Sequence, residues 1–251
     1  MKLISEKALI GENTIIEPLA IIEDDVIIGD NCIIQSGAKI CNGARIGSNV
    51  KVYSYAVVSG EPQDLKYKGE KTYTYIDNNS TIREFATVNR GTIETGMTKV
   101  GKNCLIMSYC HVAHDCILGD NVILSNVTQL AGHVVLEDWV IMGGVSKVHQ
   151  FCKIGKHSMI GADTKIVMDV APYTLVDGNP ARVETINKIG LKRRGFPPEI
   201  ISEIEEFYDT LLFSGLNNKD GISKFLEKKQ VSEEVLYCIN FIKNSKRGIH
   251  R

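Results

Sequence analysis

Histidines and a glycine occur at regular spacing in the middle of the chain, and their types indicate which chemistry they could carry. His114, Gly132 and Gln150 follow one another at intervals of 18 residues, and His111 and His133 lie beside this series. A neutral imidazole can act as a general base near neutral pH, and it is also a common zinc ligand. Glycine lets a substrate oxyanion approach its backbone N–H closely. From spacing alone these residues fit a general base first, a metal site second, and polar residues at a subunit contact third.

A repeat of six residues supplies the elements that would position this series. Every sixth residue is large and apolar in the ranges 10–58, 76–88 and 100–166, at 24 positions in all. Small or β-branched residues lie two positions earlier, and glycine often follows the large residue, where we expect a turn with positive φ. A period of six fits neither an α-helix nor a coiled coil. Short strands joined by tight turns form a parallel β-helix instead.

Three hexads per coil predict a triangular prism with faces A, B and C in chain order. Eight coils would stand about 40 Å tall. The hexads before His114, Gly132 and Gln150 all fall on face C, so these residues should stack about 4.8 Å apart on successive coils. Two interruptions of the repeat, residues 59–75 and 89–99, also begin just after a face-C hexad. Long insertions in a regular solenoid are usually functional, so we expect them beside the histidines.

The remaining sequence predicts a covered flank and a helical tail. Outward positions of face B are apolar, so we expect a partner chain or the helical tail to cover them; they are Ile15, Ile33, Leu105, Ile123, Ile141 and Met159. A prism with one apolar flank favours a closed cyclic oligomer. The hexads stop near residue 180, so we expect a β-helix over residues 1–180 and a helical domain over 181–251. The expected helices cover residues 182–194, a segment from Pro197 to about 212, 220–229 and 232–243.

Composition excludes several classes of protein. The chain has 29 basic and 30 acidic residues, which argues against a nucleic-acid-coating protein. No apolar run approaches the roughly 18–20 residues that span a bilayer, and the first residues lack the apolar core of a signal peptide. We therefore expect a cytoplasmic protein without stable membrane insertion. The seven cysteines indicate free thiols, most of them buried in the small inward series.

Several motifs together resemble the acyl-[acyl-carrier-protein]–UDP-N-acetylglucosamine O-acyltransferases, hexapeptide-repeat enzymes that begin lipid A biosynthesis. They are Gln63-Asp64-Leu65-Lys66-Tyr67, Asn89-Arg90-Gly91-Thr92, His111-Val112-Ala113-His114-Asp115-Cys116, Leu130-Ala131-Gly132-His133-Val134, Val148-His149-Gln150-Phe151 and Gly190-Leu191-Lys192-Arg193-Arg194-Gly195. The resemblance covers nearly the whole chain, including the tail. It implies that the β-helix is left-handed, that the protein is a homotrimer with active sites between subunits, and that no metal or other cofactor is needed.

The resemblance also implies a reaction and the residues that perform it. A 3-hydroxyacyl group would pass from the phosphopantetheine arm of acyl carrier protein to the glucosamine 3-hydroxyl of UDP-N-acetylglucosamine. His114 matches the general base, Asp115 a residue that orients its ring, and Gly132 the N–H that holds the oxyanion. Positions for the sugar, diphosphate or acyl arm match Asp64, Lys66, His111, His133 and Gln150. Positions near the nucleotide or the carrier protein match Asn187, Arg193 and Arg194.

Two departures from the family pattern leave alternatives open. Asn89 stands at a sugar-side position where many relatives carry histidine, so the acceptor could be a 3-amino analogue of the sugar. Ala162 stands where relatives that accept long chains often carry glycine, so the acyl pocket could be shorter. Three interpretations compete with this one. They are a related acyltransferase that uses coenzyme A or acylates an amino sugar at another position, a trimeric zinc hydratase, and a non-catalytic solenoid.

Overall fold

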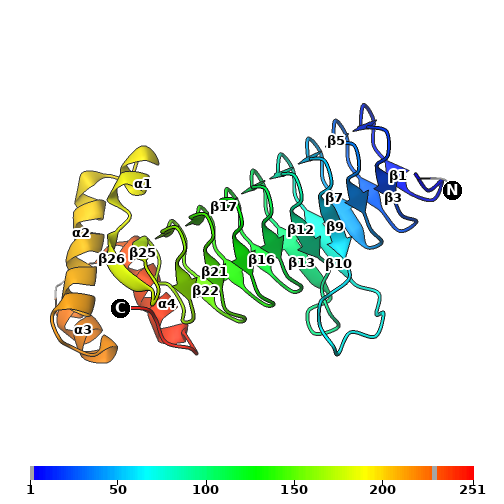
Figure 1. The fold of residues 1–251 in the computed structure, drawn as a ribbon. Coiled ribbons are helices and arrows are strands. Elements are labelled where there is room, and N and C mark those ends of the chain that lie inside the picture. Colours follow the sequence, from blue (N-terminus) through cyan, green and yellow to red (C-terminus); the bar gives the residue numbers. More distant parts are fainter. Residues whose placement is uncertain (1–2, 228–230) are drawn as a thin grey trace.

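The hexads form a three-sided parallel β-helix, closed at its C-terminal end by helices (Figure 1). The computed structural model describes residues 3–227 and 231–251. Face A consists of β1 (Leu9–Ile10), β4 (Ile27–Ile28), β7 (Ala44–Ile46), β10 (Tyr73–Ile76), β13 (Met97–Val100), β16 (Ile117–Leu118), β19 (Val135–Leu136) and β22 (Lys153–Ile154). Face B consists of β2 (Ile15–Ile16), β5 (Ile33–Ile34), β8 (Lys51–Val52), β11 (Thr81–Ile82), β14 (Leu105–Ile106), β17 (Ile123–Leu124), β20 (Ile141–Met142), β23 (Met159–Ile160), β25 (Thr174–Asp177) and β26 (Arg182–Ile186). Face C consists of β3 (Ile21–Ile22), β6 (Lys39–Ile40), β9 (Val57–Gly60), β12 (Thr87–Asn89), β15 (His111–Val112), β18 (Gln129–Leu130), β21 (Lys147–Val148) and β24 (Lys165–Ile166).

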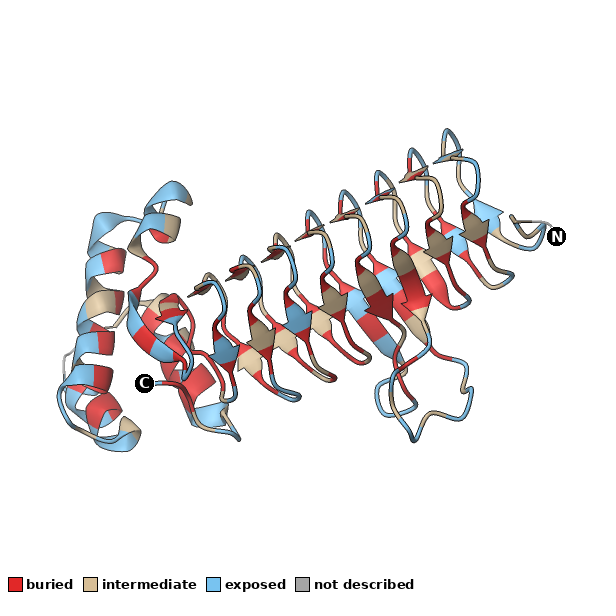
Figure 2. Cartoon of the chain, in the orientation of Figure 1, coloured by how far each residue is buried: buried red, intermediate tan, exposed pale blue. Residues whose placement is uncertain are grey.

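The register confirms the predicted assignment of hexads to faces. Val88 pairs with Val58 on one side and with Val112 on the other, so neither interruption of the repeat shifts its phase. From Ile22 to Ile166 the large apolar residue of every hexad is buried, and Figure 2 shows buried positions recurring along the strands of successive coils. All seven cysteines are free and buried, as predicted.

The turns depart from the expected role of glycine. The glycines after the large residues do not have positive φ. Instead, a Cβ on Gly29 would lie 2.7 Å from the backbone carbon of Gly47, so glycine is needed because consecutive coils touch there. Positive φ occurs two residues later, at the third residue after the strand.

We name the three edges of the prism A–B, B–C and C–A, after the faces that each edge joins in chain order. The positive-φ position carries different side chains on each edge. On the A–B edge these are Asn13, Asn31, Asn49, Asn79, Asn103, Asn121, Trp139, His157 and Tyr173. On the B–C edge they include Leu19, Tyr55, Phe85, Tyr109, Val127 and Val145, all of them exposed. On the C–A edge they include Asp115, His133 and Phe151. Asparagine adopts this conformation readily, whereas valine rarely does. The positive φ of the valines on the B–C edge therefore does not come from their own backbone preference, and the surrounding structure must impose it.

The C-terminal segment begins with a strand where a helix was expected. Residues 182–186 form β26, which pairs antiparallel with β25 and covers the last open strand edge of face B. The helices that follow are α1 (Lys188–Arg193), α2 (Pro198–Tyr208), a π-helix η1 (Asp209–Phe213), α3 (Asn218–Leu226) and α4 (Glu233–Asn244). Pro198 begins α2 and Ser232 caps α4, as predicted. The predicted end of the third helix at residue 229 lies outside the described residues. Within the described ranges, no helix combines the length and the apolar character needed to cross a bilayer.

Two loops interrupt the coils at the C–A edge. Residues 61–72 connect β9 to β10, and residues 90–96 connect β12 to β13. Figure 1 shows both loops projecting from the same side of the prism. Arg90 ties them together, since its Nη1 donates to the Ser59 carbonyl at 3.0 Å and its Nη2 donates to the Tyr67 hydroxyl at 2.8 Å.

Candidate active site

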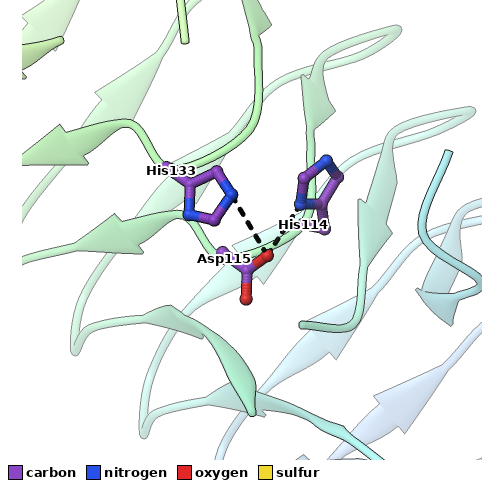
Figure 3. A group of neighbouring side chains, drawn as sticks. All are labelled: His114, Asp115 and His133. Carbon is purple, nitrogen blue, oxygen red and sulfur yellow. Dashed lines mark hydrogen bonds and ion pairs between the residues drawn. The ribbon is translucent and has the colours of Figure 1, made fainter. Parts of the chain in front are cut away.

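The centre of the candidate site is an imidazole–carboxylate pair on the C–A edge (Figure 3). Nδ1 of His114 lies 2.7 Å from Oδ2 of Asp115. An ionised carboxylate can only accept, so the neutral ring carries its proton on Nδ1 and leaves Nε2 with a free lone pair. The His114 side chain is 12% exposed, whereas that of Asp115 is fully buried. The pair therefore presents one proton-accepting nitrogen to the surface.

Asp115 is held from several directions. Oδ1 accepts a hydrogen bond from the Thr92 backbone N–H at 3.0 Å and another from the Thr95 hydroxyl. Oδ2 accepts from the Thr92 hydroxyl at 2.8 Å. Burial alone would raise the pKa of Asp115, but the hydrogen bonds from Thr95, His114 and Thr92 outweigh it and lower that pKa below its usual value. The carboxylate is therefore ionised at neutral pH although it is buried.

Gly132 lies directly against the His114 ring. A Cβ built on Gly132 would be 2.6 Å from Cε1 and 2.8 Å from Nε2 of His114, so no other residue fits this position without moving the ring. In the described part of the chain, the N–H of Gly132 donates to no acceptor. The lone pair on Nε2 of His114 and the unpaired N–H of Gly132 thus occur side by side. Attack of a nucleophile on a carbonyl requires such a pair, a base that takes the proton of the nucleophile and a donor that stabilises the oxyanion.

His133 completes the cluster one coil further on. Its ring stacks on Phe151 with centroids 4.4 Å apart and meets the edge of the His114 ring at 5.2 Å. Nε2 of His133 lies 3.1 Å from a carboxylate oxygen of Glu94 and 3.6 Å from Oδ2 of Asp115. The sequence pattern assigned no role to Thr92, Glu94 or Thr95, although all of them belong to the second predicted insertion.

Two further predicted residues lie on the neighbouring coils. Nδ1 of His111 is 2.7 Å from the Thr87 hydroxyl, and burial, with the positive charge that His114 can carry, lowers the pKa of His111. Asn89 is buried, and its Nδ2 donates to the backbone carbonyl of Glu61 at 2.5 Å. Oδ1 of Asn89 is buried with no hydrogen-bond partner in the described chain. Because the carbonyl of Glu61 fixes the orientation of the amide, Oδ1 is an acceptor that awaits a donor.

Asp64 and Lys66 lie on the first loop, beside a cavity between the two loops. This cavity of about 220 Å³ is lined by Asp64, Lys66, Tyr67, Glu70, Thr92, Ile93 and Glu94. Thr92 and Glu94 contact Asp115 and His133, so the cavity adjoins the imidazole cluster. A second hollow, of about 480 Å³ on face A, contains none of the predicted site residues.

The other predicted residues lie elsewhere on this protomer. Gln150 follows Gly132 on the C–A edge and is exposed. Ala162 is exposed on the B–C edge, and Arg193 is exposed at the end of α1. Arg194 lies at the A–B edge, where its guanidinium stands 5.0 Å above the Trp139 ring.

Asn187 uses its whole side chain within the protomer. Its Oδ1 caps α1 by accepting from the N–H of Gly190 at 3.1 Å, and its Nδ2 donates to the carbonyl of His157 at 2.9 Å. The structure therefore gives Asn187 a clear capping role and leaves its predicted contact with a nucleotide as a prediction.

The donor geometry bears on the metal alternative. His114, Asp115 and His133 offer ligand atoms that all lie within 4.8 Å of one another. Two ligands of one tetrahedral zinc ion at about 2.0–2.1 Å are roughly 3.3 Å apart. Nδ1 of His114 and Oδ2 of Asp115 are only 2.7 Å apart, which is a hydrogen bond. The set fits a hydrogen-bonded pair better than a zinc site.

Sequence comparisons find close relatives. A family profile described as "Udp N-acetylglucosamine O-acyltransferase; Domain 2" matches residues 169–250, and a profile for the bacterial transferase hexapeptide matches residues 7–42 and 97–128. The acyl-[acyl-carrier-protein]–UDP-N-acetylglucosamine O-acyltransferase of Nautilia profundicola is 47% identical over 202 residues, which are 80% of this chain and 78% of that protein. The protein of the same name from Burkholderia lata is 43% identical over 206 residues, with coverage of 80% and 79%.

Solved structures agree with these relatives. The UDP-N-acetylglucosamine acyltransferase of Bacteroides fragilis superposes with a TM-score of 0.96 at 41% identity, covering 99% of this chain and 97% of that one. The protein from Campylobacter jejuni superposes with a TM-score of 0.93 at 40% identity, covering 99% and 96%. These likenesses confirm the predicted fold, a left-handed parallel β-helix followed by a helical region.

Proposed function

The chain belongs to the family of acyl-[acyl-carrier-protein]–UDP-N-acetylglucosamine O-acyltransferases, and from that premise we propose how its own residues carry the reaction. It is an acyltransferase that moves a 3-hydroxyacyl group from acyl carrier protein to the 3-position of the glucosamine unit of UDP-N-acetylglucosamine, in lipid A biosynthesis. The observation that carries the mechanism is the free Nε2 of His114 beside the unpaired N–H of Gly132. Membership of this family excludes two of the competing interpretations, the zinc hydratase and the non-catalytic solenoid.

His114 is the general base in this proposal. Nε2 takes the proton of the acceptor hydroxyl while the oxygen attacks the thioester carbonyl, and Asp115 stabilises the imidazolium that forms. The N–H of Gly132 donates to the tetrahedral oxyanion. When the intermediate collapses, the C–S bond breaks and the imidazolium returns its proton to the departing thiolate. No step needs a metal or another cofactor; the phosphopantetheine arm is part of the donor substrate.

The substrates would occupy the cavity between the loops and the surface beside it. Asp64 and Lys66 line this cavity, and His111, His133 and Gln150 flank His114 along the C–A edge. Lysine and histidine suit the diphosphate, and aspartate suits sugar hydroxyls. We assign these residues to binding of the sugar, the diphosphate or the acyl arm.

A homotrimer would bring the separated residues to one site. The outward residues of face B are apolar, and the B–C edge carries the exposed stack of Tyr55, Phe85 and Tyr109, with centroids 5.4 and 5.1 Å apart. Face B lies between the edge of Ala162 and the edge of Arg194. If this face packs against the C–A edge of a partner subunit, both residues flank the partner's His114. Ala162 would then limit acyl length, and Asn187, Arg193 and Arg194 would meet the nucleotide or the acidic carrier protein.

Asn89 favours a second candidate acceptor, the 3-amino analogue of the sugar. A hydroxyl has one proton, which His114 takes, whereas an amine has a second proton to donate. The buried Oδ1 of Asn89 lacks a donor in the described chain and would accept a hydrogen bond from this second N–H. The alternative applies to the acceptor atom and leaves the acyl donor and the base unchanged.

The cytoplasmic location of the protein stays a prediction.

The transfer itself is tested by mass spectrometry of products. The purified protein is incubated with 3-hydroxyacyl carrier protein and with either UDP-N-acetylglucosamine or its 3-amino analogue, and acyl coenzyme A serves as the competing donor. The proposal expects an acylated nucleotide sugar that depends on the carrier protein. Equal rates with acyl coenzyme A would contradict the proposed donor. No product with either acceptor would contradict the proposed activity.

A further inference from the structure

The loop of residues 90–96 contacts the cluster of His114, Asp115 and His133 through three of its side chains. Its Thr92 and Thr95 hydrogen-bond to Asp115, and its Glu94 contacts His133. The loop itself is anchored, because Gly91 donates to the Tyr73 carbonyl at 3.1 Å and Tyr73 donates to the Gly96 carbonyl at 3.0 Å. It can therefore hold its side chains in fixed positions.

Oδ2 of Asp115 has two possible imidazole partners. It lies 2.7 Å from Nδ1 of His114 and 3.6 Å from Nε2 of His133. The two imidazoles therefore compete for the same carboxylate oxygen. If Asp115 paired with His133, the His114 ring would lose the acceptor that keeps its proton on Nδ1. The other tautomer carries the proton on Nε2, where the base must accept one.

The loop opposes this exchange on both sides. Thr92 donates from its backbone N–H to Oδ1 and from its hydroxyl to Oδ2, so it grips both oxygens of Asp115. The Thr95 hydroxyl donates to Oδ1 as well. Glu94 occupies Nε2 of His133 at 3.1 Å and so removes the competing partner. Oδ2 accepts one hydrogen bond from the Thr92 hydroxyl, and its remaining lone pair accepts the hydrogen bond from Nδ1 of His114.

We propose that Thr92 and Thr95 are positioning residues that assign Asp115 to His114 and thereby fix the His114 tautomer needed for base catalysis. They touch no reacting atom and act through the carboxylate. The inference rests on the proposed role of His114 for its effect on rate, whereas its effect on the tautomer holds whether or not His114 is the base.

The test is ¹⁵N NMR of the full-length protein labelled in its histidine rings, with the spectrum of His114→Ala used to assign His114. In the wild type at pH 8 we expect His114 to carry its proton on Nδ1. In the Thr92→Val/Thr95→Val double variant we expect a large share of the Nε2–H form and turnover reduced about tenfold or more. Thr95→Ser should keep the wild-type tautomer and rate, because it keeps the hydroxyl.

Thr74→Val is the matched control. It removes a buried hydroxyl that has no hydrogen-bond partner in the described chain, so turnover and spectrum should stay unchanged. If the double variant does not fold, Thr95→Val alone provides the same readouts, since Thr95 is exposed on the loop. An unchanged His114 tautomer in the valine variants would overturn the inference, even if turnover falls. A wild type without transferase activity would count against the proposed function, and the tautomer measurement would still decide the inference.

Discussion

His114 differs from His111 and His250 in the groups that its two ring nitrogens face. Nε2 of His250 accepts from the backbone N–H groups of Val167 and Met168 at 3.2 and 3.1 Å, so that ring ties the C-terminus to the prism. Nδ1 of His111 is bound to Thr87. Nδ1 of His114 pairs with the Asp115 carboxylate, and its Nε2 faces Gly132, whose N–H donates to no acceptor in the described part of the chain. At the scale of residues, the proposed catalysis depends on this nitrogen and on the N–H beside it.

Substitution of Gly132 tests this contact. In Gly132→Ala the new methyl group would lie 2.6 Å from Cε1 of His114, so the ring must move away from the N–H that we propose as the oxyanion donor. We expect turnover to fall about 10²-fold, because a misplacement of about 1 Å costs that much. Gly144→Ala is the folding control, since its nearest neighbour is 3.4 Å away. Steady-state kinetics with wild-type turnover in Gly132→Ala would show that the contact has no role.

Ala162 allows a test of acyl length. Glycine at this position would remove a methyl group from the proposed acyl groove, so Ala162→Gly should shift the preferred donor toward longer chains. Rates measured with a series of 3-hydroxyacyl carrier proteins provide the check. An unchanged order of rates would remove Ala162 from the groove.

At the scale of elements, the hexads determine which side chains share an edge, and for this reason the sequence predicts so much of the site. The interval of 18 residues brings His114 beside Gly132, and the unshifted phase brings both loops to the same edge. The contacts of Thr92 and Glu94 were not predictable, because the path of an irregular loop depends on tertiary contacts rather than on a repeat. The strand β26 was missed for a related reason: its residues pair only because the prism ends there with an open edge.

The aromatic stack at the end of the A–B edge predicts an acid-sensitive joint between prism and helices. His157 lies in a stack between Trp139 and Tyr173, and Phe196 and Arg194 from the tail pack against it. Burial, together with the charges of Arg194 and Lys156, lowers the pKa of His157 to about 4. The folded state therefore resists protonation that the unfolded chain accepts near pH 6.5. Stability from this site should be complete above pH 6.5 and decrease as the pH falls toward 4.

Thermal unfolding of the wild type and His157→Gln at several pH values checks this joint. We expect the variant to melt lower than the wild type at pH 7.5 and to lose less Tm on acidification to pH 5. Other groups that titrate in this range affect both proteins alike. Parallel Tm curves for the two proteins would show that His157 contributes nothing to the acid sensitivity.

At the scale of the whole molecule, the proposed site requires more than one copy of the chain. The C–A edge supplies the proposed base and the proposed oxyanion donor, whereas Ala162 and Arg194 lie on the two other edges of the same prism. The exposed ridge of the B–C edge includes valines with positive φ, a conformation that is energetically unfavourable for valine. Packing of this ridge in a subunit interface would offset the unfavourable energy.

Mixed oligomers test this assembly. Trimers formed from equal amounts of His114→Ala and Arg194→Ala chains carry, in about a quarter of their sites, an intact His114 from one subunit and an intact Arg194 from its neighbour. We expect each variant to be nearly inactive alone and the mixture to recover roughly a quarter of wild-type activity. A mixture as inactive as its components would place both residues in the site of a single subunit.

The most direct measurement is the turnover of His114→Ala with acyl carrier protein thioester and nucleotide sugar, compared with the wild type at equal oligomeric state and Tm. Removal of a single general base should reduce kcat by about 10²–10⁴. The variant should still bind both substrates and keep its fold, because the His114 side chain packs on an edge rather than in the core. A variant that folds, assembles and turns over within a few-fold of the wild type would contradict the assignment of His114 as the base.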